Sequence, residues 1–129
     1  MPTVELNGTT IYYETHGEGS DIVLIHGFGD SAALWHSQFK DLEDSFRLTA
    51  IDIRGHARSG APTELGLYTQ DQVVEDLRAV MDVVGIEKAV FGGHSLGGYT
   101  SMRFYQRYPN RVQALILSGT GPGYRKMEG

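Results

Sequence analysis

The sequence predicts an α/β fold, in which a mostly parallel β-sheet carries helices on both faces and an antiparallel hairpin precedes it. Residues 3–6 and 10–14 are strand-like and flank Asn7-Gly8, the strongest short hairpin signal. Residues 21–25 form an apolar, β-branched run, which is typical of a strand buried on both faces of a parallel sheet. Beyond this run, strand-like and helix-like segments alternate, and such alternation implies right-handed crossovers between parallel strands.

The later elements follow in order. A helix is expected to begin at residue 31 or 32, because large apolar side chains recur at helical spacing: Trp35, Phe39 and Leu42. After a strand over residues 47–53, a second helix begins with a capping-box pair, Thr69 and Gln72, and ends at Gly85. Its apolar stripe consists of Val73, Leu77, Val80, Met81 and Val84. Strands over residues 88–92 and 112–117 enclose a third helix, from residue 96 to about residue 108, which Pro109 ends.

Composition points to one globular domain over residues 1–129, since 40% of the residues are hydrophobic and 21% are charged. The formal net charge of −5 argues against a protein that binds nucleic acid or an anionic membrane. The sequence has no cysteine, no signal-peptide pattern and no run near the roughly 18 apolar residues of a membrane span. We therefore expect a cytoplasmic protein that binds neither nucleic acid nor membranes.

The segment Gly93-His94-Ser95-Leu96-Gly97 reads G-x-S-x-G and lies between a predicted strand and a predicted helix. In that context the motif predicts a sharp turn that holds the serine hydroxyl in the open, so Ser95 is a candidate nucleophile. Side chains at positions 93 and 97 would collide with neighbouring backbone in so tight a turn. The alternative interpretation is a glycine-rich turn with a capping serine.

Three loops, after residues 25, 53 and 92, meet at the carboxyl edge of the predicted sheet, where open parallel sheets bind their ligands. The amide of Leu96 begins a helix and is a natural donor to an oxyanion, and the amide of Phe28 is a second candidate. We expect His26, Gly27 and His94 to lie beside the substrate.

The histidines at this edge have no evident role as a general base. His94 is adjacent to Ser95, and neighbouring side chains diverge; His26 and His56 are of the kind that orients loops through hydrogen bonds, although either could reach Ser95. Asp52 and Arg54 favour a local hydrogen-bonded turn that braces the rim, the alternative being a substrate-binding loop. No histidines have metal-ligand spacing with acidic partners, so no metal and no cofactor are expected.

Three motifs in order resemble the signature of the α/β-hydrolase superfamily, and more narrowly its serine esterase, enol-lactonase and haloperoxidase-like branch. They are His26-Gly27-Phe28-Gly29, Asp52-x-Arg54-Gly55-His56-x-x-Ser59 and Gly93-His94-Ser95-Leu96-Gly97-Gly98. The resemblance covers residues 3–123 and implies a hydrolase of small acyl substrates such as esters or lactones. Serine rather than aspartate at position 95 does not match the haloalkane dehalogenases or epoxide hydrolases. Ala57 stands where the family often has glycine.

Such enzymes have roughly 250 residues, and their catalytic acid and histidine follow the serine. The resemblance therefore implies the N-terminal half of the fold, truncated after about the sixth strand. No residue inherits the acid and histidine roles, so the chain alone is expected to be weak or inactive. The strand over residues 112–117 would become an unpaired edge beside an apolar patch, which predicts self-association or a complementary chain.

Two other functions remain open. A non-catalytic half-fold that assembles with itself or with a partner chain would equally lack the acid and the histidine. A dinucleotide-binding domain is the less favoured alternative: residues 27–32 fit G-x-G-x-x-A after a strand, and Asp52 ends the next strand. That alternative does not account for the glycine-rich motif around Ser95 or for the leading hairpin.

Overall fold

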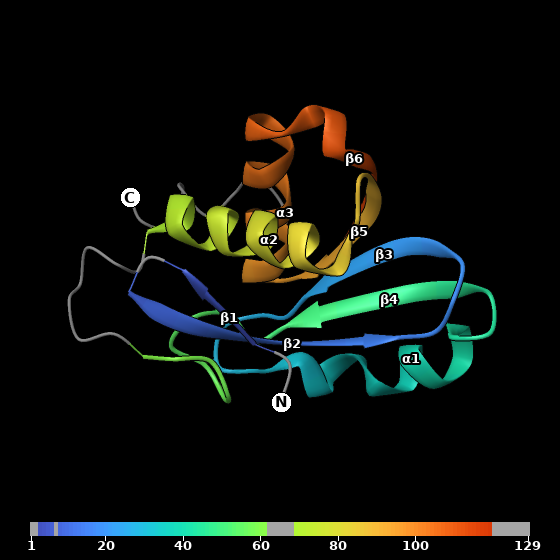
Figure 1. Cartoon of the computed structure of the whole chain (residues 1–129), viewed down its shortest axis with the longest axis horizontal. Coiled ribbons are helices and arrows are strands. Elements are labelled where there is room, and N and C mark those ends of the chain that lie inside the picture. The colour runs from blue at the N-terminus through green and yellow to red at the C-terminus, as the bar shows by residue number, and fades with distance from the viewer. Residues whose placement is uncertain (1–2, 7, 62–68, 120–129) are drawn as a thin grey trace.

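A single six-stranded sheet forms the centre of the computed structural model, which describes residues 3–6, 8–61 and 69–119 (Figure 1). The strand order is β1-β2-β4-β3-β5-β6. The four parallel strands are β3 (Ser20–Ile25), β4 (Phe46–Ile51), β5 (Ala89–His94) and β6 (Val112–Ser118). The antiparallel strands are β1 (Thr3–Leu6) and β2 (Thr9–His16), with β2 also pairing antiparallel to β4. The predicted mostly parallel sheet with a leading hairpin is confirmed.

Helices cover both faces of the sheet (Figure 1). Helix α1 (His36–Leu42) lies on one face, and α2 (Gln70–Val84) and α3 (Leu96–Arg107) lie on the other. The predicted first helix is divided, because its first turn is a 3₁₀ helix over Ala32–Trp35 that the hydroxyl of Ser31 caps. One apolar core lies under α2 and α3, and a smaller one lies under α1. None of the helices in the described ranges is long and apolar enough to cross a membrane.

Strand β3 lies between β4 and β5, and both neighbours run parallel to it. Val23, Leu24 and Ile25 are all buried, as expected for a strand covered on both faces. Ile25 is paired with Ile51 of β4 and Gly93 of β5. The loops after β3, β4 and β5 therefore begin at the same edge of the sheet, which is the edge where the sequence predicts a site.

Helix α2 begins as predicted, although the predicted capping box is only half formed. The hydroxyl of Thr69 accepts a hydrogen bond from the amide of Gln72. The side-chain oxygen of Gln72 is buried and has no hydrogen-bond partner, so the reciprocal bond of a capping box is missing. The predicted stripe faces the core: Val73, Leu77, Val80 and Met81 are buried, and Val84 packs against them.

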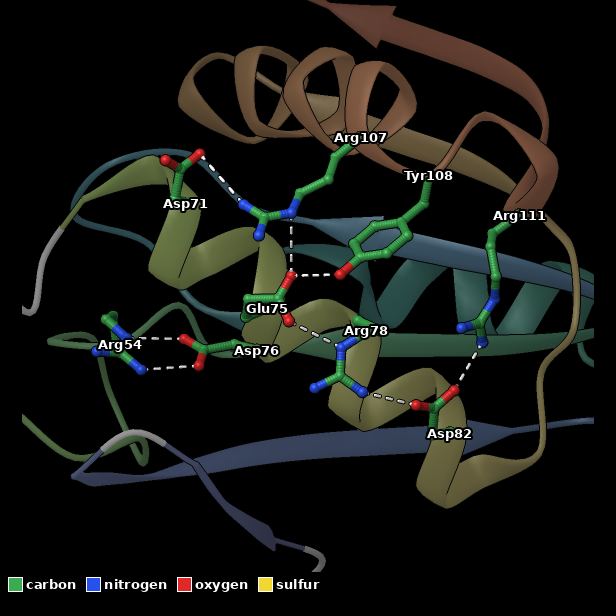
Figure 2. Close-up of polar contacts among 9 residues, drawn as sticks. All are labelled: Arg54, Asp71, Glu75, Asp76, Arg78, Asp82, Arg107, Tyr108 and Arg111. Carbon is green, nitrogen blue, oxygen red and sulfur yellow. Dashed lines mark hydrogen bonds and ion pairs between the residues drawn. The ribbon is translucent and has the colours of Figure 1, made fainter.

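Charged residues tie α2 to α3 and to the 3₁₀ turn over Pro109–Arg111 that precedes β6 (Figure 2). Glu75 of α2 accepts hydrogen bonds from Arg78 and from the hydroxyl of Tyr108, and Arg111 lies 2.9 Å from Asp82. These side chains are partly exposed, and exposed pairs each contribute only about 0–1 kcal/mol. The network fixes the packing of α2 on α3 but lies away from the loop edge of the sheet.

Candidate active site

Ser95 occupies a strained turn between β5 and α3. Its backbone has φ 55° and ψ −118°, and its side chain is partly exposed. Among the described residues, only Ser95 and Ala57 combine a side chain with a positive φ. Such backbone costs about 1–3 kcal/mol and persists only where the surroundings over-determine it. The predicted strand-to-helix turn is therefore present.

The turn at Ser95 is held by close approach of backbone segments. A Cβ at position 97 would lie 2.1 Å from the carbonyl oxygen of Ile25, and one at position 93 would lie 2.4 Å from the carbonyl oxygen of Gly97. Neither position can hold a side chain without moving backbone. The amide of Ser95 also donates to the carbonyl of Ser118 at the end of β6, at 2.8 Å. The start of α3 is thus pressed directly against the end of β3.

The loop after β3 is a tight turn around Phe28. The amide of Asp30 donates to the carbonyl of Gly27 at 3.1 Å, and Gly29 has φ +80°, as the third position of a type II turn requires. A Cβ at position 27 would lie only 3.1 Å from Cβ of Ser95. The turn therefore lies against Ser95. The Phe28 side chain extends outward and is 83% exposed.

The side chain of His26 makes a hydrogen bond to this turn. Its buried ring accepts a hydrogen bond at Nε2 from the amide of Ile53, at 2.8 Å, so Nδ1 carries the proton and donates to the carbonyl of Gly27 at 2.7 Å. Burial lowers the pKa of His26 below its ordinary value, which favours this neutral form.

The carbonyl of Gly27 therefore accepts two hydrogen bonds, from His26 and from the amide of Asp30. The C=O and N–H of a trans peptide point in opposite directions, so these two bonds also fix the direction of the Phe28 amide. The ring of His26 acts on the turn and is itself fully buried, which differs from the expected place beside a substrate.

His94 lies at the rim and is partly exposed. Its Nδ1 is 3.4 Å from the hydroxyl of Ser118, so the ring is turned toward the end of β6. A Cβ at position 27 would lie 3.6 Å from Cδ2 of this ring. His94, Ser95 and the Phe28 turn are thus neighbours at one edge, as the sequence predicted.

A cavity of about 160 Å³ opens beside the two candidate oxyanion donors. At roughly 30 Å³ for a group the size of a water molecule, it has room for about five such groups. Its lining combines apolar side chains with amide, hydroxyl, imidazole and guanidinium groups. The residues that line it are Phe28, Ile53, Arg54, His56, Gln70, Val73, Leu96 and Thr100.

The predicted local pairing of Asp52 with Arg54 is wrong. Arg54 instead makes two hydrogen bonds of 2.8 Å to Asp76 of α2, and both side chains are fully buried (Figure 2). Burial raises the pKa of Asp76, and the hydrogen bonds from Arg54 oppose that shift. The sequence held a signal for this pairing: Asp76 lies between Val73 and Leu77 on the buried stripe of α2, where a carboxylate needs a partner.

Asp52 accepts hydrogen bonds from the amide of Ala32 at 2.7 Å and from that of Arg58 at 3.0 Å. It is 2% exposed, so its carboxylate holds two loops together and does not face a cleft. A dinucleotide-binding domain needs an accessible acid at this position for the ribose. The structure therefore argues against that alternative. Over the described ranges, no three histidine or acidic side chains gather as metal ligands.

Comparison with known proteins identifies the family. The family model described as alpha/beta hydrolase fold matches residues 22–128. The chain belongs to the α/β hydrolase fold family. The resemblance of the three motifs to the α/β-hydrolase superfamily and the predicted fold are confirmed.

Individual relatives carry different names. A pimeloyl-[acyl-carrier protein] methyl ester esterase of Aliivibrio fischeri is 34% identical over 94% of this chain and 44% of its own length. Epoxide hydrolase 3 of Mus musculus is 27% identical over 95% of this chain and 34% of its own length. The solved epoxide hydrolase of Bacillus megaterium superposes with a TM-score of 0.84 at 32% identity, over 90% of this chain and 41% of that chain. The chain thus spans well under half the length of the relatives that it matches.

Proposed function

We propose that Ser95 is the nucleophile of a hydrolase that acts on esters, lactones or related small acyl substrates. The observation that carries the proposal is the strained backbone of Ser95, with the Phe28 turn packed against it. Strained backbone clusters at active sites, and here it carries a serine hydroxyl at the edge of a parallel sheet where ligands bind. The amides of Leu96 and Phe28 are the proposed donors to the oxyanion.

The reaction follows from the chemistry of a serine. Its hydroxyl oxygen attacks the acyl carbon, the carbonyl oxygen becomes the oxyanion, and the leaving alcohol departs with a proton. Water then hydrolyses the acyl-serine ester and restores the hydroxyl. Serine attack on an epoxide would instead form an ether, which water does not cleave in this way. The serine therefore favours acyl substrates over epoxides, although epoxide hydrolases are among the structural relatives.

In this proposal, the general base and the acid that orients it come from polypeptide that corresponds to the part of the relatives which this chain does not span. His26 and His56 are poor candidates for the general base, because both nitrogens of each ring are already hydrogen-bonded to backbone. The oxyanion donors and binding alone leave roughly 10³–10⁴-fold catalysis over water in a serine hydrolase that lacks its triad. We expect activity of that reduced kind from this chain by itself.

A fluorophosphonate probe tests the assignment, because it phosphonylates activated serines. Because this chain lacks the proposed general base, we expect slow labelling of the wild-type chain, seen at high probe concentration and mapped to Ser95 by mass spectrometry, and none in Ser95→Ala. Ser118→Ala, which removes a second hydroxyl at the same rim, is the control and should keep the label. Hydrolysis of p-nitrophenyl acetate but not of styrene oxide would place the substrate among acyl compounds. Undiminished labelling of Ser95→Ala would contradict the assignment.

A second candidate is a non-catalytic half-fold that assembles with itself or with a complementary chain. Strand β6 favours it, because its outer edge has no strand partner among the described residues. Ile116 is 61% and Leu117 39% exposed on this strand, and exposed apolar edges promote association. Sedimentation over a concentration series should then show oligomers that Ile116→Lys dissociates, with no probe labelling of Ser95. A monomer at every concentration would exclude self-assembly.

A further inference from the structure

His56, like His26, makes a hydrogen bond to the Phe28 turn. Its Nε2 accepts from the amide of Gly29 at 3.0 Å, so Nδ1 carries the proton and lies 3.3 Å from the carbonyl of Arg54, to which it donates. Its ring also contacts the ring of His26 at a centroid distance of 5.0 Å and the ring of Phe28 edge-on at 5.6 Å.

The two histidines hold the two peptide units on either side of Phe28. His26 fixes the peptide between Gly27 and Phe28 through the carbonyl of Gly27, and His56 fixes the next peptide through the amide of Gly29. The orientation of these two planes defines both backbone dihedral angles of Phe28. The Phe28 amide is therefore aimed by both contacts together with the Asp30–Gly27 hydrogen bond, and loss of either histidine contact loosens the turn.

We propose that His56 is a positioning residue that holds the Phe28 amide in place as an oxyanion donor. The inference rests on the proposed function and adds to it a residue that does not itself touch the reacting atoms. The contact is anchored in the core, because the backbone that holds His56 belongs to Arg54, whose guanidinium is bound to Asp76 of α2. The position of α2 against the sheet therefore helps to set the position of the Phe28 turn, through Asp76, Arg54 and His56.

Two substitutions separate the hydrogen bond from the ring contacts. His56→Gln keeps an acceptor near the place of Nε2 and loses the ring, whereas His56→Phe keeps a ring and loses the acceptor. The full chain is labelled with the fluorophosphonate probe, and the rate at Ser95 is measured for wild type and both variants. The chemical shift and solvent exchange of the Gly29 amide are followed by NMR, and thermal unfolding confirms that each variant is folded.

We expect His56→Phe to slow labelling about tenfold or more, because a misaimed oxyanion donor loses much of its effect, while His56→Gln stays close to wild type. The Gly29 amide should exchange faster in His56→Phe alone. A purely structural role would lower the unfolding temperature of both variants without this split in labelling. Equal labelling of the two variants, or a Gly29 amide that does not respond, overturns the inference. A wild-type chain that the probe never labels overturns the proposed function instead, and the Gly29 amide still reports separately on His56.

Discussion

The turn at Ser95 and the turn at Phe28 lie side by side but are held by different forces. The first is fixed by backbone packing, since a Cβ at Gly97 would lie 2.1 Å from a carbonyl oxygen of β3. The second is fixed by hydrogen bonds with two histidine rings, of which His26 donates to the carbonyl of Gly27 and His56 accepts from the amide of Gly29. A steric constraint does not depend on solution conditions, whereas a histidine can accept a hydrogen bond only while its nitrogen is unprotonated. We therefore expect the two halves of the site to fail under different perturbations.

Gly97→Ala is expected to have the largest effect, because the clash is with the backbone of Ile25 and His26 and cannot be relieved by a side-chain rotation. We expect a loss of more than about 4 kcal/mol in the free energy of unfolding, measured by urea titration. Gly92→Ala is the control on β5, three residues before Ser95. Its Cβ would meet only the flexible end of Leu24, at 2.9 Å, so a cost of about 1–3 kcal/mol is expected. Equal losses would show that packing does not single out the turn.

The sterically fixed parts of the molecule were the parts that the sequence predicted. The apolar run of β3, the paired strands β1 and β2 and the glycines of the turn at Ser95 each leave a local pattern in the sequence, whereas Asn7 of the predicted hairpin signal lies outside the described residues. Strand and helix order followed from these patterns, and the structure confirms that order. The ends of elements were predicted less well. The strand expected over residues 47–53 is β4, which ends at Ile51, and the first helix begins as a 3₁₀ turn. Capping and tertiary contacts determine such ends.

Acidification should reduce the stability that His26 contributes, because a protonated Nε2 cannot accept the hydrogen bond from Ile53, and should leave the packed turn at Ser95 unaffected. Burial lowers the pKa of His26 in the folded chain below its ordinary 6.5, so the unfolded chain binds a proton first as the pH falls. Stability from this group is complete above pH 6.5 and declines below it, by at most about 1.4 kcal/mol per pH unit, until the folded chain protonates as well.

Urea unfolding between pH 7.5 and 5 checks this expectation. His26→Gln keeps an acceptor for the amide of Ile53 but does not titrate, so its stability should decline less over this range. The idea fails if His26→Gln and the wild type lose stability in parallel.

The hydrogen-bonded parts of the site could be predicted only in outline. The position of His26 and His56 on loops at the sheet edge indicated that they orient loops, but not which peptide each would bind. Arg54 was expected to pair with Asp52, two residues away, and instead binds Asp76, which is 22 residues further along the chain. A long side chain can reach several acceptors, and only the packing of α2 on the sheet decides among them. Sequence spacing carries no information of that kind.

Ala57→Gly should give the smallest effect and the opposite sign. Ala57 follows His56 directly and has φ 46°, a conformation that costs a residue with a Cβ about 1–2 kcal/mol. Glycine removes that cost but makes the unfolded chain more flexible, so we expect a net gain of about 0.5 kcal/mol in the free energy of unfolding. Ala61→Gly, on the same loop at a residue without a positive φ, should be neutral or destabilising. A gain in stability for Ala57→Gly alone would mean that the backbone of the loop carrying His56 is strained. The hydrogen bonds of the loop would then hold it in that conformation without the help of a glycine. An equal loss in both variants would assign no strain to this loop and would leave the turn at Ser95 as the strained element of the site.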